Sequence, residues 1–341
     1  MRIAINGFGR IGRIVTRNLF QNAHFREKIE LVALNDVGNP TESAFLIKRD
    51  SLYGTLDFDV SATDHSINIG GQEVIALQER DPNKLDWGKL GVDVVLECTG
   101  RFTSKEAASV HIKNGAKKVL VSAPGKGVDA TIVMGVNHES YNHDSHHVIS
   151  NASCTTNCLA PMASVLHKEF GIVKGLMTTI HSYTSDQRLL DNTHSDPRRA
   201  RAAALNMIPT TTGAARAVGL VIPDLAGKLD GFAIRVPTPN VSMTDLVAEI
   251  KKPASKEEIN QALKAAATSS LKGILDVSDE PLVSSDYVGS RFSSVVDSAL
   301  TTVISDSGDK GSLVKVCSWY DNETGFSNRM LDLCMLIASK L

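Results

Sequence analysis

The sequence of 341 residues predicts an α/β fold in two domains: a doubly wound parallel sheet, followed by an α+β domain with a mainly antiparallel sheet. Strand-like and helix-like segments alternate through the first half, as they do in βαβ units. The strand at 93–99 is apolar, as burial on both faces of a parallel sheet requires. In the second half strands outnumber helices, and the short ones alternate polar with apolar residues, which favours antiparallel pairing.

The first strand, at 2–5, leads into a glycine pattern typical of nucleotide-binding turns. Gly7, Gly9 and Gly12 follow the spacing G-x-G-x-x-G, and a helix with an apolar face starts directly after them. The first glycine allows a tight turn, the second lets a pyrophosphate approach the backbone, and the third brings helix and strand together. The pattern predicts a Rossmann-type dinucleotide site; a glycine cluster that only packs helix on strand is the alternative.

An acidic residue ends the second strand. Strand 29–34 leads to Asp36, whose carboxylate can accept hydrogen bonds from the ribose hydroxyls of an adenine dinucleotide. Further along we expect a helix at 104–114 and strands at 118–122 and 131–136. Ligands of open α/β sheets bind at the carboxyl ends of such strands.

The stretch 150–158, SNASCTTNC, leads from small polar residues into a helix whose apolar face continues to Phe170. Ser153 can cap that helix, which places Cys154 in its first turn. Unpaired backbone N–H groups there favour negative charge, so we expect this thiol to ionise readily and to act as a nucleophile. A buried structural thiol is the alternative, because free cysteines are among the most buried residues.

A histidine and several groups suited to anions lie in the second half. His181 follows a strand at 175–180, where it can orient or deprotonate a thiol; a structural histidine is the other interpretation. The polar run 182–201 has almost no apolar periodicity and holds four arginines, which suits phosphate contacts or salt bridges across a subunit interface. A hydroxyl-rich turn at 209–213 precedes a helix and can bind an anion.

Composition argues against several classes of protein. Lys and Arg number 36 against 38 Asp and Glu, a net charge of −2, so nothing favours nucleic acid or a membrane surface as a partner. No apolar run is long enough to span a bilayer, and the N-terminus lacks the apolar core of a signal peptide. Five cysteines without a regular framework fit a reducing compartment, so we expect a cytoplasmic location. We interpret His143, His146 and His147 as surface residues and expect no metal site.

Six segments together resemble one family, the phosphorylating glyceraldehyde-3-phosphate dehydrogenases of type I, nearly from end to end of the chain. They are AINGFGRIG at 4–12, SNASCTTNCLAP at 150–161, HSYT at 181–184, RRARAAAL at 198–205, RVPTPN at 235–240 and WYDNETG at 319–325. The stretch around Cys154 is highly specific. Thr324 and Phe326 depart from residues common in the family, without touching the catalytic pair that the resemblance implies.

The resemblance implies a role for each candidate residue. Cys154 would be the nucleophile and His181 the residue that activates it. The cofactor would contact Gly7, Gly9, Arg10, Ile11, Gly12, Asp36, Arg80, Ser122 and Asn322. Inorganic phosphate would be held by Ser153, Thr155, Thr212 and Gly213 with Arg199 near, and the phosphate of the substrate by Thr184, Asp186 and Arg235.

The family's reaction would be the NAD-dependent conversion of glyceraldehyde 3-phosphate and inorganic phosphate to 1,3-bisphosphoglycerate through a cysteine thioester. We expect a dinucleotide-binding domain at 1–153, a catalytic domain at 154–320, and a last helix at 321–341 that packs back on the first domain. A homotetramer is implied, with the run 182–201 lining both the active site and a subunit interface. The alternatives are an erythrose-4-phosphate dehydrogenase and a non-catalytic NAD-binding sensor or interaction protein.

Three determinants bear on the choice between NAD and NADP. Asp36 would repel a 2′-phosphate and Val37 offers it no hydroxyl, which favours NAD. Asn192 and Thr193, where members strict for NAD often carry Leu-Pro, are small polar residues that can hydrogen-bond that phosphate. The charge of Asp36 is the largest effect, so we expect a clear NAD preference with weak NADP use.

Overall fold

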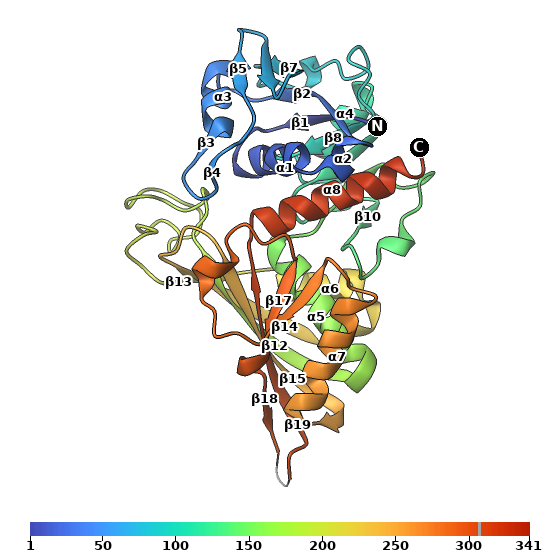
Figure 1. Cartoon of the computed structure of the whole chain (residues 1–341), viewed down its shortest axis with the longest axis vertical. Helices are drawn as coiled ribbons and strands as arrows, with labels where there is room; N and C mark the ends of the chain where they lie inside the picture. The colour runs from blue at the N-terminus through green and yellow to red at the C-terminus, as the bar shows by residue number, and fades with distance from the viewer. Residues whose placement is uncertain (306–307) are drawn as a thin grey trace. The chain divides into compact units, whose positions relative to one another are not determined.

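The computed structural model describes residues 1–305 and 308–341 and divides into two compact units. Unit 1 contains Met1–Ile132, His138–Ser153 and Ser327–Leu341. Unit 2 contains Val133–Asn137 and Cys154–Phe326. Figure 1 colours the chain from its N-terminus to its C-terminus and labels the elements of both units.

Unit 1 is built on a nine-stranded sheet with the order β10-β11-β9-β8-β1-β2-β7-β6-β5. All pairs from β10 to β7 are parallel, and the edge pairs among β7, β6 and β5 are antiparallel. The strands are β1 Arg2–Asn6, β2 Glu30–Asn35, β5 Val60–Ala62, β6 Ser66–Ile69, β7 Gln72–Leu77, β8 Val94–Glu97, β9 Lys118–Val121, β10 Ala130–Thr131 and β11 Val148–Ser150. Because the strand order reverses at β1, this is the doubly wound sheet that the sequence predicts, and β1 marks its ligand-binding end.

Helices connect the strands of both units, and local capping sets where several of them begin. They are α1 Arg10–Gln21, α2 Ala23–Arg26, α3 Pro40–Lys48, α4 Lys105–Lys113, α5 Cys154–Phe170, α6 Ala214–Val221, α7 Lys256–Thr268 and α8 Thr324–Ala338. The Ser104 hydroxyl accepts the N–H of Ala107 at 3.2 Å, so the helix expected at 104–114 is confirmed. Among residues 1–305 and 308–341, no helix has the length and apolar character that crossing a bilayer takes.

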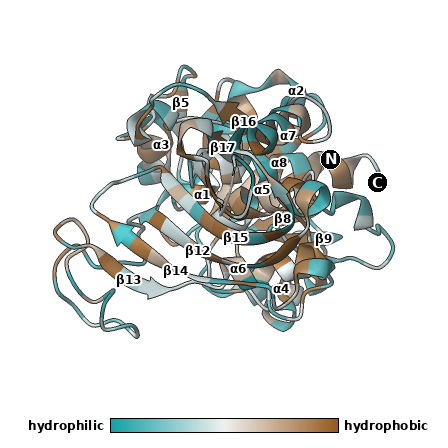
Figure 2. Ribbon diagram, turned by 90° about the horizontal axis from the view of Figure 1, so that it is seen from below, coloured by the Kyte–Doolittle hydropathy of each residue, from teal (hydrophilic) through white to brown (hydrophobic). Residues whose placement is uncertain are grey.

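The centre of the nine-stranded sheet is apolar. Val94, Val95 and Leu96 in β8 are 0% exposed, and in Figure 2 both β8 and β9 carry the colour of hydrophobic residues. Burial on both faces explains why the sequence of β8 shows an unbroken apolar run instead of alternation.

One strand expected in the first half of the chain is wrong over most of its length. β10 ends at Thr131, although the sequence predicts a strand at 131–136. The N–H of Val133 donates to the Asn137 side chain at 2.8 Å, and the N–H of Val136 donates to the Val133 carbonyl at 3.0 Å. A side chain four residues further on therefore takes the bond that strand pairing would need, and a turn forms.

Unit 2 is built on an eight-stranded sheet with the order β13-β14-β12-β15-β19-β17-β16, with β18 also paired to β19. Its strands are β12 Ile172–Ser182, β13 Ile208–Thr211, β14 Leu229–Val236, β15 Ser242–Ala254, β16 Leu275–Ser278, β17 Ser294–Asp297, β18 Thr302–Ile304 and β19 Gly311–Tyr320. Only β12 with β14 and β16 with β17 pair in parallel, so the mainly antiparallel sheet is confirmed. A short two-stranded sheet, β3 Arg49–Asp50 and β4 Gly54–Thr55, belongs to unit 1.

The long strand β12 has two different faces. Met177, Thr179 and His181 are buried, and they alternate with Leu176, which is 68% exposed. In Figure 1 the helices α5, α6 and α7 lie on one side of this sheet, and α5 packs against β15, β17 and β19. The period of two therefore turns His181 to the face that α5 covers.

Gly7→Ala should destabilise the protein, whereas Gly9→Ala should not. Gly7 has a φ of +95°, and a Cβ built on it would lie 2.6 Å from the Thr99 nitrogen; a Cβ on Gly9 would meet nothing within 4 Å. Backbone strain of this kind costs about 1–3 kcal/mol. Urea denaturation should show a loss of about that size in the free energy of unfolding for Gly7→Ala, and less than about 0.5 kcal/mol for Gly9→Ala. Equal losses would contradict this account of the turn.

Candidate active site

A thiol and an imidazole meet in unit 2. The Sγ of Cys154 lies 3.5 Å from the Nε2 of His181, which is a hydrogen-bond distance for sulfur. Cys154 is the first residue of α5, and His181 is the second-last residue of β12. The structure thus brings together the two residues that the resemblance pairs as nucleophile and activating group.

The orientation of the His181 ring is fixed through its other nitrogen. Nδ1 lies 2.7 Å from the carbonyl oxygen of Ser182 and donates to it, since a carbonyl oxygen only accepts. In the neutral ring Nε2 is therefore free of a proton and can accept the one from the Cys154 thiol. A thiol, a ring nitrogen that can accept its proton and a carbonyl that orients the ring are all present, as nucleophilic catalysis requires.

Burial governs the protonation of this pair. Burial, together with the charge of Arg235, lowers the pKa of His181 to about 3. Burial also raises the pKa of the Cys154 thiol, against smaller lowering effects from Arg235 and from hydrogen bonds with Thr155. The expectation that the helix start makes this thiol ionise readily is wrong for the chain without substrate, because lost hydration outweighs it. The cation that favours the thiolate is Arg235 and not an imidazolium.

Tyr320 is a third group at this pair, and our reading of the sequence did not single it out. Its hydroxyl lies 2.9 Å from the hydroxyls of both Thr155 and Thr179, and the residue is 1% exposed. Its ring meets the His181 ring edge to face, with centroids 6.0 Å apart. Tyr320 therefore restrains the imidazole, and its only sequence signal was its place in the motif at 319–325.

Arg235 provides donors for an anion beside the pair. β12 and β14 run in parallel with His181 opposite Arg235, so the register of the sheet brings the two together. Arg235 Nη1 donates to the Thr184 hydroxyl at 2.9 Å and to Gln187 Oε1 at 3.4 Å. Among the described residues, the buried Nε of Arg235 and Nε2 of Gln187 have no partner. Two buried donors without an acceptor suit a phosphate group.

Arg199 and Asp186, both expected at the phosphates, form an ion pair of 2.7 Å with each other. Arg199 also donates to the Thr210 hydroxyl at 3.0 Å and to the Thr211 carbonyl at 3.3 Å. Burial alone would raise the pKa of Asp186, but hydrogen bonds from Arg199 and His194 outweigh it and lower that pKa. An ionised carboxylate repels phosphate, so Asp186 fits the task of holding Arg199 better than that of a phosphate ligand.

The turn before α6 is a second place suited to an anion. The Thr212 hydroxyl accepts the N–H of Ala214 at 3.2 Å, and Gly213 precedes the helix without a side-chain cap. A Cβ on Gly213 would meet nothing within 4 Å, and α6 packs against α5. Backbone N–H groups at such a helix start favour negative charge. Ser153, expected at the same phosphate, belongs to unit 1.

Asn322 is held by two serines, one of which directly follows His181 in the chain. Its Oδ1 accepts the Ser182 hydroxyl at 2.7 Å and the Ser242 hydroxyl at 3.0 Å. The carboxamide oxygen is therefore occupied, and the amide nitrogen is the end that can donate to a ligand. The role of Asn322 as a cofactor contact stays a prediction.

Unit 1 carries a cavity of about 280 Å³ lined by residues at the carboxyl ends of β1, β2 and β8. Gly7, Gly9, Asp36 and Arg80 are among the residues that line it. Gly9 precedes α1 without a side-chain cap, so the first N–H groups of that helix can bind a phosphate. The Asp36 carboxylate accepts the Phe8 N–H at 2.5 Å, which fixes it at the mouth of the glycine turn. The open space at Gly9 leaves the backbone accessible to a phosphate group, as the pyrophosphate of a dinucleotide requires.

Other residues expected at the cofactor lie beside this cavity or are paired elsewhere. Arg10 donates to Asp50 at 2.6 Å, and Ile11 and Gly12 form the first turn of α1 with it. A Cβ on Gly12 would lie 2.4 Å from the Gly7 oxygen, so its glycine is required by packing. Ser122 directly follows β9. No cluster of His, Cys, Asp and Glu suited to a metal occurs within the described part of the chain.

A glycine-turn cavity in one unit, and separately a thiol–imidazole pair near a guanidinium and an amide that have unpartnered donors among the described residues, suit a dinucleotide-dependent enzyme that acts through a cysteine on an anionic substrate. Comparison with known families agrees. Residues 1–105 match "Glyceraldehyde 3-phosphate dehydrogenase, NAD binding domain", and residues 153–322 match "Glyceraldehyde 3-phosphate dehydrogenase, C-terminal domain". The chain belongs to the glyceraldehyde-3-phosphate dehydrogenase family, and NAD is its cofactor.

Curated relatives match over the whole chain. Glyceraldehyde-3-phosphate dehydrogenase of Geobacillus stearothermophilus is 58% identical over 340 residues, covering 100% of this chain and 99% of the relative. Glyceraldehyde-3-phosphate dehydrogenase 2 of Trichormus variabilis is 56% identical over 341 residues with the same coverage. Glyceraldehyde-3-phosphate dehydrogenase 1 of Bacillus subtilis is 54% identical over 340 residues, again covering 100% of this chain and 99% of the relative.

Arg235→Ala should slow the alkylation of Cys154 by iodoacetamide, a neutral reagent, at pH 7. Arg235 is the largest of the effects that lower the pKa of this thiol, and burial raises that pKa, so removing the guanidinium lets burial raise it further. An upward shift in the midpoint of the alkylation profile slows the reaction at pH values below that midpoint, because a smaller fraction of the thiol is then ionised. The exposed Arg291 serves as control, and Arg291→Ala should leave the profile unchanged. An unchanged or lower midpoint in Arg235→Ala would show that Arg235 does not support the thiolate.

Proposed function

We propose that this chain oxidises D-glyceraldehyde 3-phosphate to 1,3-bisphosphoglycerate with NAD and inorganic phosphate, through a thioester on Cys154. The observation that carries the proposal is the Cys154–His181 contact beside Arg235, whose buried Nε lacks a partner among the described residues. The thiol accounts for covalent capture of an aldehyde, and the open donor accounts for a phosphorylated substrate. The names of the curated relatives agree with this activity.

The first covalent step joins the thiol to the aldehyde carbon. As the Cys154 Sγ bonds to that carbon, the thiol proton passes to His181 Nε2 over the 3.5 Å contact and from there to the aldehyde oxygen. The product is a hemithioacetal with a tetrahedral carbon. His181 Nε2 then takes the hydroxyl proton while a hydride leaves the carbon, and a thioester remains on Cys154. NAD, when bound, accepts that hydride.

Inorganic phosphate then releases the acyl group. A phosphate oxygen bonds to the thioester carbon, the carbon–sulfur bond breaks, and the departing sulfur of Cys154 recovers a proton from His181. A thioester is more reactive toward phosphate than the ester that a serine would form, which is why this chemistry needs sulfur. The groups we propose for this phosphate are Ser153, Thr155, Thr212, Gly213 and Arg199.

The phosphate already carried by the substrate needs a separate place. Thr184 and Arg235, which are hydrogen-bonded to each other at 2.9 Å, are the proposed ligands. We add Gln187, which the sequence did not single out, because its Nε2 is a buried donor without a partner in residues 1–305 and 308–341. Asp186 holds Arg199 in this arrangement and does not bind the anion itself.

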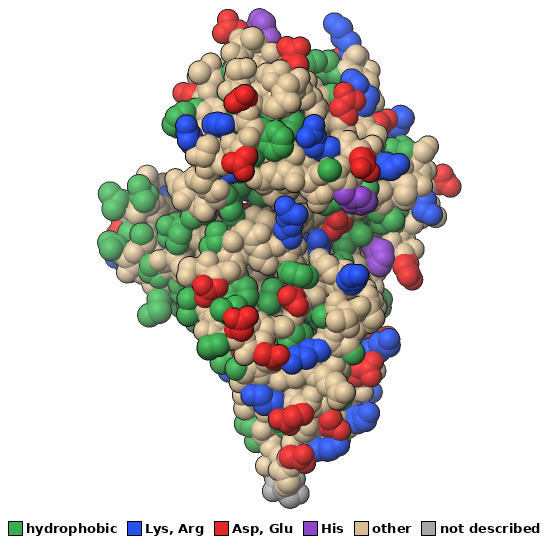
Figure 3. Space-filling view, viewed as in Figure 1, with side chains coloured by type: hydrophobic (Ala, Val, Ile, Leu, Met, Phe, Trp, Pro, Cys, Tyr) green, Lys and Arg blue, Asp and Glu red, His purple; other side chains and the backbone are tan. Residues whose placement is uncertain are grey.

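A homotetramer is the finer part of the proposal, and exposed apolar surface supports it. Leu189, Leu190, Leu205 and Met207 are between 71% and 82% exposed. They belong to the segment that leads into β13, where Figure 3 shows hydrophobic side chains gathered on the surface. Monomeric proteins rarely expose contiguous apolar patches of this kind, so we expect a second copy of the chain to cover them.

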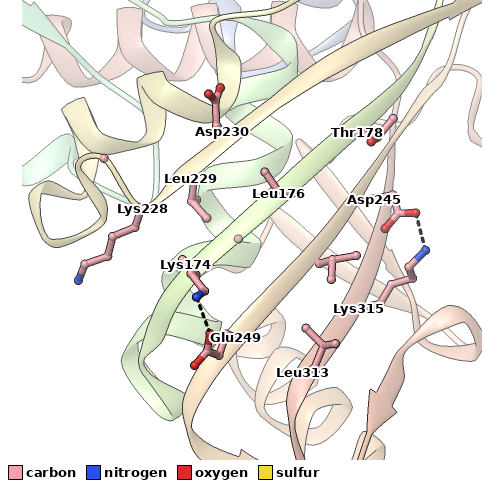
Figure 4. A pocket seen from close by; sticks show the side chains of 13 residues that line it. Lys174, Leu176, Thr178, Lys228, Leu229, Asp230, Asp245, Glu249, Leu313 and Lys315 are labelled. Atoms are coloured by element: carbon pink, nitrogen blue, oxygen red, sulfur yellow. Dashed lines mark hydrogen bonds and ion pairs between the residues drawn. The ribbon is translucent and has the colours of Figure 1, made fainter.

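The face of the eight-stranded sheet without helices offers a second such surface. It holds a groove of about 750 Å³ lined by Leu176, Leu229, Val247 and Leu313 among others. Figure 4 shows charged residues around these apolar ones, including the ion pairs Lys174–Glu249 at 3.3 Å and Lys315–Asp245 at 2.7 Å. Two separate apolar surfaces per chain suit an assembly of four chains. Light scattering should therefore give a molar mass four times that of one chain.

We also propose a cytoplasmic location. All five cysteines, Cys98, Cys154, Cys158, Cys317 and Cys334, are free, as a reducing compartment keeps them. The proposed nucleophile, Cys154, is one of them, and an oxidising compartment would favour its oxidation. Glyceraldehyde 3-phosphate and inorganic phosphate are the partners, and neither nucleic acid nor a membrane is expected.

The test of the reaction is NADH absorbance with glyceraldehyde 3-phosphate and NAD, in the presence and absence of inorganic phosphate. With phosphate we expect sustained turnover. Without it, NADH formation should stop after about one equivalent per chain, because the thioester on Cys154 is not released. Sustained turnover without phosphate would contradict the proposal, and a higher catalytic efficiency with erythrose 4-phosphate would favour the alternative substrate.

Arg235→Ala should raise the KM for glyceraldehyde 3-phosphate far more than the KM for unphosphorylated glyceraldehyde. A charge-assisted hydrogen bond is worth about 1.5–3 kcal/mol, so a loss of roughly ten- to a hundredfold in affinity is expected for the phosphorylated aldehyde alone. Initial rates with both aldehydes give the comparison. Equal losses would mean that Arg235 has a structural role only.

Asp36→Gly should narrow the gap between NAD and NADP in catalytic efficiency. The carboxylate of Asp36 lines the cavity of unit 1, and a 2′-phosphate brought to it would meet a like charge. Thr193→Pro should widen the gap, since it removes a small polar residue from the exposed segment that the resemblance places at the adenosine end. Equal efficiencies in the wild-type chain, or NADP ahead, would show that Asp36 does not govern the choice.

A further inference from the structure

Under the cavity of unit 1, buried hydrogen bonds converge on one carboxylate. Glu97 ends β8 and is 1% exposed. The Trp87 indole N–H donates to His111 Nδ1 at 3.0 Å, and His111 Nε2 lies 3.0 Å from Glu97 Oε2. Because an indole nitrogen only donates, His111 carries its proton on Nε2 and donates it to Glu97. Trp87 and His111 are both 0% exposed.

A second run of hydrogen bonds reaches the same oxygen from another side. The backbone N–H of Glu79 donates to Asn35 Oδ1 at 2.8 Å. Asn35 Nδ2 donates to Asn6 Oδ1 at 2.8 Å, and Asn6 Nδ2 donates to Glu97 Oε2 at 2.7 Å. The other oxygen of Glu97, Oε1, accepts the Thr99 N–H at 2.8 Å and also the Thr99 hydroxyl.

The direction of these hydrogen bonds leaves one kind of side chain for position 97. In each run, every intermediate residue accepts one hydrogen bond and donates the next. The group at the far end therefore determines the direction of all the hydrogen bonds in that run. The far ends are the Trp87 indole and the Glu79 backbone N–H, which can only donate, and the Thr99 backbone N–H is a third such group. Position 97 must supply acceptors at both oxygens and no donor, which is what an ionised carboxylate does.

We propose that Glu97 is a positioning residue of the NAD site, a role that rests on NAD binding by unit 1 and not on the chemistry of Cys154. The groups it joins, Asn6, Glu79 and Thr99, come from three walls of the cavity. Asn35 strengthens the link, because its Nδ2 also donates to the Glu79 carbonyl at 2.9 Å. Glu97 thereby holds the glycine turn, the Arg80 segment and the turn after β8 in one arrangement.

Glutamine at this position keeps the shape but breaks the pattern of donors. If the side-chain nitrogen of glutamine took the place of Oε1, it would face the Thr99 N–H. If it took the place of Oε2, it would face the donors of Asn6 and His111. Turning the Asn6 amide over to relieve this would point its nitrogen at Asn35 and pass the conflict on to the Glu79 N–H. Aspartate, in contrast, offers only acceptors but is shorter by one methylene group.

Titration calorimetry with NAD on the full chain separates polarity from shape. Glu97→Gln should raise the dissociation constant for NAD at least about tenfold, the equivalent of one buried group left unsatisfied. Glu97→Asp should raise it less. A role in packing alone predicts the reverse order, because glutamine matches the shape and aspartate does not. Wild-type affinity in Glu97→Gln, or weaker binding by Glu97→Asp than by Glu97→Gln, would overturn the proposal.

A control variant and an NMR measurement complement the calorimetry. Glu73→Gln, an exposed glutamate of β7, removes the same charge and should bind NAD as the wild type does. The chain has two tryptophans, so an ¹⁵N indole spectrum holds two signals. Glu97→Gln should move the Trp87 signal and leave that of Trp319, which donates to Asp297 in unit 2. An unmoved Trp87 signal would contradict the network.

A third variant keeps the proposal testable should Glu97→Gln fail to fold. Asn35→Asp has the same shape as the native residue and replaces the donor to Asn6 by an acceptor. It disrupts the hydrogen bond between Asn35 and Asn6, which is one hydrogen bond removed from Glu97. It should also raise the dissociation constant for NAD about tenfold. Wild-type affinity in Asn35→Asp would overturn the proposal.

Discussion

The contact between the Cys154 Sγ and the His181 Nε2 is the interaction around which the candidate site of unit 2 is arranged. It joins the first residue of a helix to the end of a strand, and both ends are prepared by other elements. The alternation of β12 turns His181 toward α5, and the Ser182 carbonyl fixes the ring's second nitrogen. Tyr320, bonded to Thr155 and Thr179, restrains the ring edge to face.

Burial of the thiol and the imidazole has an energetic cost for their charged forms. Taking a thiol and an imidazole out of water disfavours the charged form of each, which is why the pKa of Cys154 is raised and that of His181 falls to about 3. Arg235 opposes this effect at the thiol. The same guanidinium has a buried Nε without a partner within the described residues. One buried cation therefore lowers the pKa of the thiol and also offers a donor that suits an anion.

Local patterns predict the fold and the place of Cys154 at the start of α5, because the physics behind these patterns is local. The glycine spacing at 7–12 and the serine at the start of α4 act within a few residues, and both have the expected effect. The strand expected at 131–136 is wrong because a single side chain, Asn137, takes a backbone donor that no propensity reveals. The end of a strand that depends on one such hydrogen bond cannot be predicted from the periodicity of the sequence.

Features that depend on distant segments could not be predicted from sequence patterns. Tyr320 meets Thr155 across 165 positions of the chain, and Glu97 meets Asn6 across 91. The raised pKa of Cys154 likewise comes from burial by the folded unit, whereas the sequence shows only a helix start, which predicts the opposite direction. Long-range hydrogen bonds and burial thus decide the electrostatics of both sites, while short-range patterns decide where their elements begin.

We propose that Cys154 carries the acyl group during the reaction. Mass spectrometry of the protein after incubation with glyceraldehyde 3-phosphate and NAD, without phosphate, tests it most directly. The account predicts one phosphoglyceroyl group on the peptide that contains Cys154, bound at that residue and removed when inorganic phosphate is added. The buried Cys158, four residues further along α5, should carry none. Acyl groups on Cys158, or full turnover with no acylated cysteine under any condition, would contradict the account.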